Sequence, residues 1–211
     1  MKYTRELIKD TVEGMGYKYF ESINYDVNII GIRNSETEGK VTNRFDDTMT
    51  ISYKDEAGLW IYHEFNCTTD PGLHWVDHPM LEKGVAILKP GQYRKSHKIR
   101  LHGGKYTALG QQNPVKVYRD NDKDDKYDFD ESTVDEGLFG INIHRATSLE
   151  DKTSSQVGKW SAGCQVIASN SNWHSFLSIC EKAREVWGNN FSYTLITSDD
   201  ILHQEDVNKT I

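Results

Sequence analysis

The feature that most constrains the fold of this chain is a series of short segments between residues 17 and 118. They are rich in Val, Ile, Thr and aromatic residues, and Gly, Asp, Asn and Pro separate them. The clearest examples are DVNIIGIR, TMTISYK, LWIYHEFNC, VAILKPGQY and NPVKVYR. Such segments favour β-strands, and short connections between them favour antiparallel pairing. The sequence therefore predicts a mostly β fold built on a mainly antiparallel sheet.

Two helices are expected to accompany the strands. Apolar residues recur at helical spacing early in the chain, which predicts an N-terminal helix within residues 1–16. A second helix is predicted over about 171–187, because its apolar residues share one face and Gly188 stands at the C-cap position. FGINIHRA and FSYTLIT are expected to be further strands. We expect one domain, residues 1–211, of the mostly β (α+β) class.

Composition narrows the range of partners. The net charge of −7 and the lack of a Lys/Arg block argue against a nucleic-acid partner. No apolar run approaches the roughly 20 residues of a membrane span. The first residues, MKYTRELIKDTVEGMG, lack the apolar centre of a signal peptide. We therefore expect a protein made in the cytoplasm, without a membrane span.

Three cysteines occur, an odd number without CxxC spacing, so neither a disulfide framework nor a cysteine-rich zinc site is indicated. Cys180 falls on the apolar face of the expected second helix and is predicted to be buried. Cys67 lies beside two threonines and is expected at a buried strand end. Cys164 differs, because WSAGCQVI places it after Ser and Gly among small residues.

A thiol is an effective nucleophile at neutral pH when an imidazole accepts its proton and a third group fixes the tautomer of that imidazole. His144 is the best partner for Cys164, because it ends an expected strand and the loop 146–159 returns the chain to the cysteine. Backbone N–H groups around Gly163 and Cys164 would form an oxyanion hole, and Ser161 would orient one of them. The alternative is a buried cysteine that serves packing alone.

The order His, sixteen residues, then Ser-x-Gly-Cys resembles the signature of the L,D-transpeptidase (YkuD-like) domain, in which such a gap leads to Ser-His-Gly-Cys. The matching positions are His144, Ser161, Gly163 and Cys164. CTTDPG at 67–72 and LKPGQY at 88–93 resemble that family's strands around its Thr-Pro-x-Gly-x-Phe segment. The resemblance covers residues 60–170 loosely and implies a transpeptidase-like core over about 60–200.

The resemblance implies a β-sandwich-like fold and a Cys164 nucleophile that forms a thioacyl enzyme with a peptidoglycan stem peptide. It also implies His144 as general base, with the carbonyl group of Arg145 as its orienting partner. Acyl transfer to an amine would form a cross-link, and transfer to water would hydrolyse the peptide; the sequence leaves both open. No cofactor is required for this chemistry.

Two positions depart from the family pattern. Ala162 stands where the family has His, and Gln165-Val166 stands where it usually has Ile-Arg. The missing Arg removes the group expected to hold a substrate carboxylate. His102, in LHGGKY, is a candidate replacement, and the alternative is a surface-turn histidine. Trp160, Ala162 and Gln165, beside the cysteine, are the other expected substrate contacts.

These departures keep a second hypothesis open, a non-catalytic module that binds cell-wall peptides or a partner protein. A third is a metal-dependent peptidase, suggested by the imidazole and carboxylate groups of HWVDH at 74–78. That spacing matches no zinc peptidase motif, and the segment is expected to be a loop. A wall enzyme without an export signal would act after lysis or as part of a phage particle or other assembly.

An acidic segment, DNDKDDKYDFDE at 120–131, has oxygen ligands at the spacing of an EF-hand loop. The ligand positions 1, 3, 5, 9 and 12 are Asp120, Asp122, Asp124, Asp128 and Glu131. Position 6, normally Gly, is Asp125, and no clear helices flank the loop. The segment predicts either a structural Ca²⁺ loop or a solvated acidic turn.

Overall fold

The computed structural model describes residues 2–210. Its strands are β1 (Asn28–Arg33), β2 (Asp47–Lys54), β3 (Trp60–Thr68), β4 (Val85–Leu88), β5 (Gly91–His102), β6 (Tyr106–Gln111), β7 (Val115–Asp120), β8 (Asp135–Gly137), β9 (Ile143–Arg145), β10 (Gln165–Ile167) and β11 (Phe191–Thr197). Its helices are α1 (Arg5–Gly14), α2 (Leu73–Asp77), α3 (Asn170–Trp187) and α4 (Ser198–Thr210), with 3₁₀ turns at Ser35–Thr37 and Glu131–Thr133. The predicted mostly β, α+β fold is confirmed.

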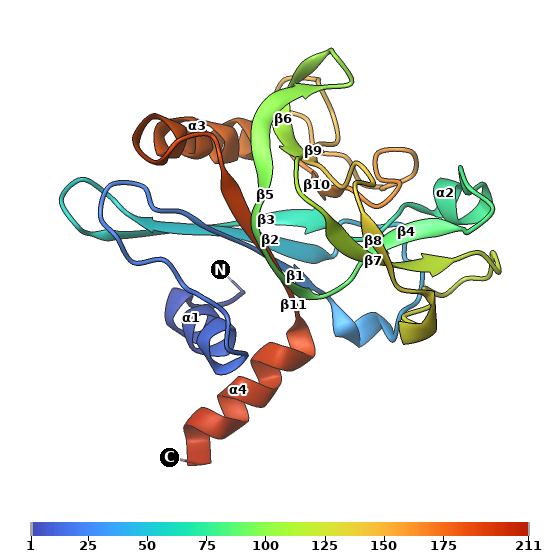
Figure 1. Ribbon diagram of the computed structural model, residues 1–211, viewed down its shortest axis with the longest axis horizontal. Coiled ribbons are helices and arrows are strands. Elements are labelled where there is room, and N and C mark those ends of the chain that lie inside the picture. Colours follow the sequence, from blue (N-terminus) through green and yellow to red (C-terminus); the bar gives the residue numbers. More distant parts are fainter. Residues whose placement is uncertain (1, 211) are drawn as a thin grey trace.

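Eight strands close into a barrel in the order β1-β11-β5-β6-β9-β10-β3-β2, and β4, β7 and β8 form a smaller sheet beside it (Figure 1). The resemblance implied a β-sandwich-like arrangement, whereas the strands form a closed barrel with a smaller sheet beside it. Most neighbouring strands are antiparallel, as expected. Two pairs, β1–β11 and β9–β10, are parallel.

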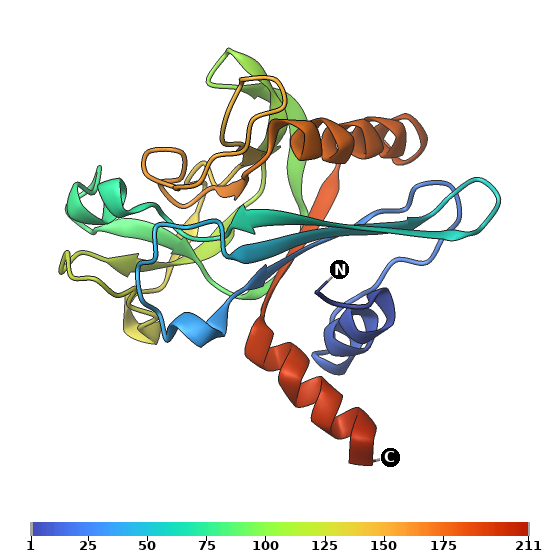
Figure 2. The same ribbon diagram turned by 180° about the vertical axis from the view of Figure 1, so that it is seen from behind.

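Helix α3 packs on the barrel core, in one buried cluster with Ile29 and Leu195, while α1 and α4 pack together on the other face of β1 and β11, against Ile30, Ile32 and Ile196 (Figures 1 and 2). The N-terminal helix is confirmed: the Thr4 hydroxyl caps it by accepting from the Leu7 N–H at 3.2 Å. The predicted second helix is confirmed as α3, which Gly188 ends with a positive φ of 81°.

Two helices were not predicted. The HWVDH segment, expected to be a loop, contains the single-turn helix α2. Helix α4 follows β11 directly, and a reciprocal capping contact marks its start. The Thr197 N–H donates to the Asp200 carboxylate at 2.8 Å, and the Asp200 N–H donates to the Thr197 hydroxyl at 3.3 Å.

The barrel interior connects the core to the strand that follows Cys164. A Cβ at Gly31 on β1 would overlap the hydroxyl group of Tyr193, so glycine makes room for this buried ring. The Tyr193 hydroxyl donates to the Gln165 side-chain oxygen at 2.7 Å. The Gln165 amide in turn donates to the carbonyl groups of Thr69 and Gly163, both at 3.2 Å. The loop that carries the cysteine is therefore tied to the packed core.

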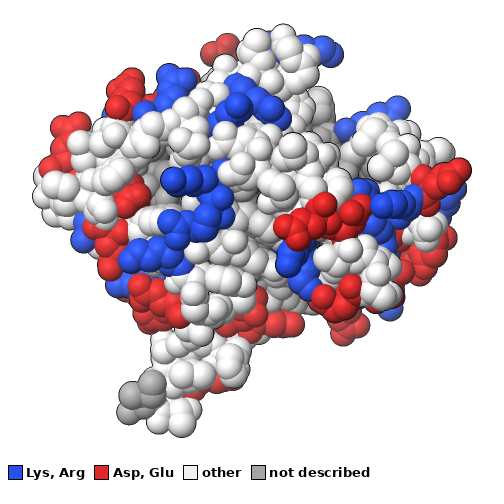
Figure 3. Space-filling model, viewed as in Figure 1, with Lys and Arg blue, Asp and Glu red and all other residues white. Residues whose placement is uncertain are grey.

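Lys and Arg are interspersed with Asp and Glu over the face shown in Figure 3. Within residues 2–210, no helix has the length and apolar character needed to cross a bilayer.

Candidate active site

Cys164 and His144 lie on neighbouring parallel strands. His144 on β9 is in register with Val166 on β10, and Cys164 directly precedes that strand. Register partners point to the same side of a sheet, and residues two apart share a face. Ile143 belongs to the buried core cluster, so His144 and Cys164 belong to the opposite face of the pair. The sequence pattern that suggested a Cys–His pair thus corresponds to adjacent strands.

Ser161 shapes the turn before the cysteine. Its fully buried hydroxyl donates to the Cys164 carbonyl oxygen at 2.7 Å and accepts from the Gly163 N–H at 3.1 Å. Gly163 has a φ of 123°, and a Cβ there would overlap the carbonyl oxygen of Ala86. This position therefore requires glycine. Ser161 therefore occupies the Gly163 N–H, one of the two donors expected for an oxyanion hole.

The Cys164 side chain is partly exposed, and its Sγ donates to the Gly140 carbonyl oxygen at 3.3 Å. Burial raises the pKa of this thiol to about 11, and the backbone N–H of Asn142 lowers it in part. The resting cysteine is therefore protonated at neutral pH. Cys67 and Cys180 are buried, as predicted, and burial raises both thiol pKa values well above the usual range.

His144 is buried, and its Nδ1 lies 2.8 Å from the Arg145 carbonyl oxygen. A carbonyl only accepts, so Nδ1 carries the proton and Nε2 keeps the lone pair. The Tyr106 hydroxyl lies 3.2 Å from the same Nδ1. Burial lowers the pKa of His144 to about 4, against the opposing effect of the Arg145 carbonyl. The ring is thus a neutral imidazole with a fixed tautomer.

His102 lies against His144, with ring centroids 4.4 Å apart. The β5–β6 hairpin places His102 in register with Tyr106. The Asn142 side-chain amide donates to His102 Nδ1 at 3.1 Å, so the proton of this second imidazole is on Nε2. Burial lowers the pKa of His102. The structure therefore gives the site two neutral imidazoles, although the motif supplied only one.

Tyr106 and Asn142 also belong to the site, although the sequence motif did not include them. The sequence offered a signal for each residue. Asn142 is two residues before His144, and Tyr106 follows His102 closely, after the two glycines of LHGGKY. The guanidinium of Arg145 lies 4.6 Å from the centroid of the Tyr106 ring. Burial raises the pKa of Tyr106, and the charge of Arg145 opposes that rise.

The three residues expected to contact substrate beside the cysteine lie in three different environments. Gln165 is fully buried and bonded within the core, so it supports the cysteine loop and does not line a cleft. Ala162 lines a pocket of about 230 Å³, together with Met80, Phe139 and Arg119. Trp160 is 47% exposed. A larger cavity of about 360 Å³ lies elsewhere, at Arg33.

The acidic segment does not form an EF-hand arrangement. Asp120, Asp122 and Asp128 each place a carboxylate oxygen within 4.8 Å of the others. Glu131 instead pairs with Lys89 and accepts from the Tyr118 hydroxyl at 3.1 Å. Asp124 accepts from the backbone N–H of Lys126 at 2.7 Å. Three of the five expected ligands converge and two do not.

The histidines of HWVDH stack on each other, with the rings of His74 and His78 5.1 Å apart. Over residues 2–210, the only group of three or more converging His, Cys, Asp or Glu side chains is the aspartate cluster. The arrangement that a zinc peptidase needs is therefore not assembled at residues 74–78.

No family model matches the chain, and comparisons with curated proteins and solved structures found no match. The resemblance to the L,D-transpeptidase signature accordingly rests on the residues of this chain alone.

Proposed function

We propose that this protein is a cysteine-dependent acyltransferase or hydrolase acting on peptidoglycan stem peptides. The observation that carries the proposal is the Cys164–His144 arrangement, in which adjacent strands present a thiol and an imidazole whose tautomer the Arg145 carbonyl fixes. A positioned base beside a nucleophile, itself oriented by a third group, is the general pattern of covalent catalysis. The substrate class comes from the resemblance of the motif to the L,D-transpeptidase signature.

In the proposed reaction, Cys164 attacks the carbonyl carbon of a stem-peptide amide. His144 Nε2 accepts the thiol proton as the carbon–sulfur bond forms, and the resulting imidazolium donates that proton to the leaving amine as the carbon–nitrogen bond breaks. The second half runs in reverse order, with an acceptor amine or water attacking the thioester and His144 taking its proton. The thiol is returned, and the products are a new amide or a carboxylic acid.

The raised thiol pKa and the lowered imidazole pKa determine when the proton moves. Burial keeps Cys164 and His144 both neutral in the resting state. Proton transfer therefore accompanies the attack and does not precede it. We assign stabilisation of the oxyanion to the Cys164 N–H, because Ser161 already occupies the Gly163 N–H.

Arg145 is the group that we propose to hold a substrate carboxylate. Its guanidinium lies over the ring of Tyr106, next to the two imidazoles. A guanidinium is always charged and matches a carboxylate in geometry. Arg145 would then replace the arginine that the family carries after its cysteine, and His102 would contribute a neutral N–H donor. The pocket at Ala162, with Met80 on its wall, would accept an apolar part of the peptide.

The test is incubation with purified disaccharide-tetrapeptide, with and without an amine acceptor, followed by mass spectrometry of the products. Cys164→Ala and His144→Ala should each reduce turnover by roughly a thousandfold or more. His203→Ala, at an exposed histidine on α4, should leave it unchanged. If Cys164→Ala retains turnover and melts at the same temperature as the unmodified protein, the proposal is excluded.

One observation favours a second candidate, a peptide-binding module. Burial holds Cys164 in its protonated form and its Sγ donates to Gly140, so the resting site is not an ion pair. A binding module would retain stem-peptide affinity in both Cys164→Ala and the unmodified protein and would convert no substrate in either. Calorimetry with the same tetrapeptide, run beside the product assay, distinguishes the two.

A further inference from the structure

The aspartate cluster at the end of β7 contains a buried carboxylate with an unsatisfied oxygen. Asp120 is 3% exposed, and its Oδ1 has no hydrogen-bond partner among the described residues. Its Oδ2 accepts from the backbone N–H of Asp128 at 3.3 Å. A buried polar atom without a partner is costly, and a buried charge needs compensation. The structure of the loop thus leaves one strong acceptor to be satisfied.

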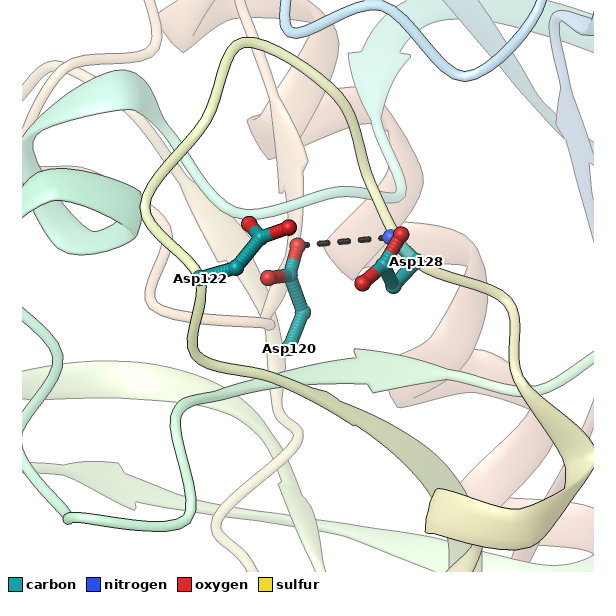
Figure 4. A group of neighbouring side chains, drawn as sticks. All are labelled: Asp120, Asp122 and Asp128. Carbon is teal, nitrogen blue, oxygen red and sulfur yellow. Dashed lines mark hydrogen bonds between the residues drawn. The ribbon is translucent and has the colours of Figure 1, made fainter.

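Two more carboxylates lie beside that of Asp120. Asp122 and Asp128 approach Asp120 from the segment that leaves β7 and from the segment that returns (Figure 4). One oxygen from each lies within 4.8 Å of the others. Burial raises the pKa of Asp120 to about 6, and the charges of Asp128 and Asp122 add to that rise.

The geometry suits one ion. Ca²⁺ binds oxygen ligands at about 2.3–2.6 Å, so two ligands on opposite sides of the ion are separated by roughly 4.6–5.2 Å. Carboxylate oxygens of irregular arrangement are the ligands that this hard cation accepts, with water completing its shell. We propose that Asp120, Asp122 and Asp128 bind Ca²⁺.

The ion would link Asp120, at the end of β7, to the loop that follows it. Residues 121–128 leave the small sheet and touch the barrel side of the molecule through Val41, whose N–H donates to the Asp125 carbonyl at 2.7 Å. On the other side, Gly84 packs so closely on the Asp120 backbone that a Cβ would overlap it. A cation at Asp120 would fix the loop between these two contacts. Its role is structural, and it stands independently of the cysteine chemistry.

The test is calorimetric titration of the full chain with Ca²⁺ after dialysis against a chelator, paired with thermal melting. We expect one bound ion per chain and a rise in melting temperature with Ca²⁺ concentration. Asp122→Asn and Asp128→Asn remove one charge each at exposed positions, so the fold should survive, and each should weaken Ca²⁺ binding about tenfold or more.

Asp125→Asn is the matched control, because it removes the same charge from an exposed residue of the same loop outside the cluster. It should change the affinity about twofold or less. Absence of both heat and a melting shift at millimolar Ca²⁺ would overturn the proposal. Equal weakening by Asp125→Asn and by the two cluster variants would also overturn it, since the response would then reflect loop charge alone.

Discussion

The thiol of Cys164 should ionise only far above neutral pH, and the rate of alkylation measures this. Burial raises its pKa to about 11, against about 8.5 for an unperturbed cysteine. At about pH 8 the thiolate fraction falls from roughly one quarter to about one part in a thousand. The more basic thiolate is intrinsically about tenfold more nucleophilic, which offsets part of that loss. Folded protein should therefore react with iodoacetamide roughly twentyfold more slowly than protein unfolded in urea.

The assay is peptide mapping after timed pulses of iodoacetamide between about pH 7 and pH 11. The rate at Cys164 should still be rising at about pH 10, where a normal cysteine has reached its plateau. Cys67 and Cys180 should react more slowly still, because both are fully buried. A plateau below about pH 8 at Cys164 would refute the argument from burial and indicate a preformed thiolate–imidazolium pair. Equal labelling of all three would refute the partly exposed position of Cys164.

Three further predictions follow from the site. Gly163→Ala should cost about 3 kcal/mol of unfolding free energy through steric overlap and a strained φ, whereas Gly140→Ala, with open space around it, should cost about 1 kcal/mol in urea melts. Burial lowers the pKa of His144 to about 4, so the unfolded chain binds more protons between that value and about 6.5. The free energy of unfolding should therefore fall as pH drops through this interval, by up to about 3 kcal/mol. Thermal melts across pH should show a weaker pH dependence of stability in His144→Gln. The same pH dependence in the variant and the unmodified protein would contradict this prediction. Arg145→Ala should raise KM for the tetrapeptide about tenfold with a smaller effect on kcat, and an unchanged KM would remove its assigned role.

The sequence predicted much of the fold because its signals are local. Alternating β-rich segments and two amphipathic helices were recognisable without tertiary information. The capping residues of α4, Thr197 and Asp200, were also visible in the sequence, but the weakly amphipathic segment after them concealed the helix. Barrel closure was not predictable, because it depends on the pairing of β1 with β11, strands at opposite ends of the chain.

The same distinction between local patterns and long-range strand pairing applies to the candidate site. The placement of His144 and Cys164 at neighbouring strands followed from one motif and one connecting loop. Tyr106 and His102 reach the site on a hairpin whose partner strand, β9, lies more than thirty residues further along the chain, and no local pattern encodes that pairing. Gln165 was expected to contact substrate because it follows the cysteine, yet strand alternation turns it into the core.

In the proposed reaction, Cys164 forms a thioester with a stem peptide. The direct measurement is intact-protein mass spectrometry after brief acid quenching of a reaction with disaccharide-tetrapeptide, followed by peptide mapping. We expect a mass increase equal to the donor peptide less its leaving amine, located on the peptide that contains Cys164 and lost in Cys164→Ala. An unmodified protein under conditions that consume substrate, or an adduct on Cys67 or Cys180, would contradict it.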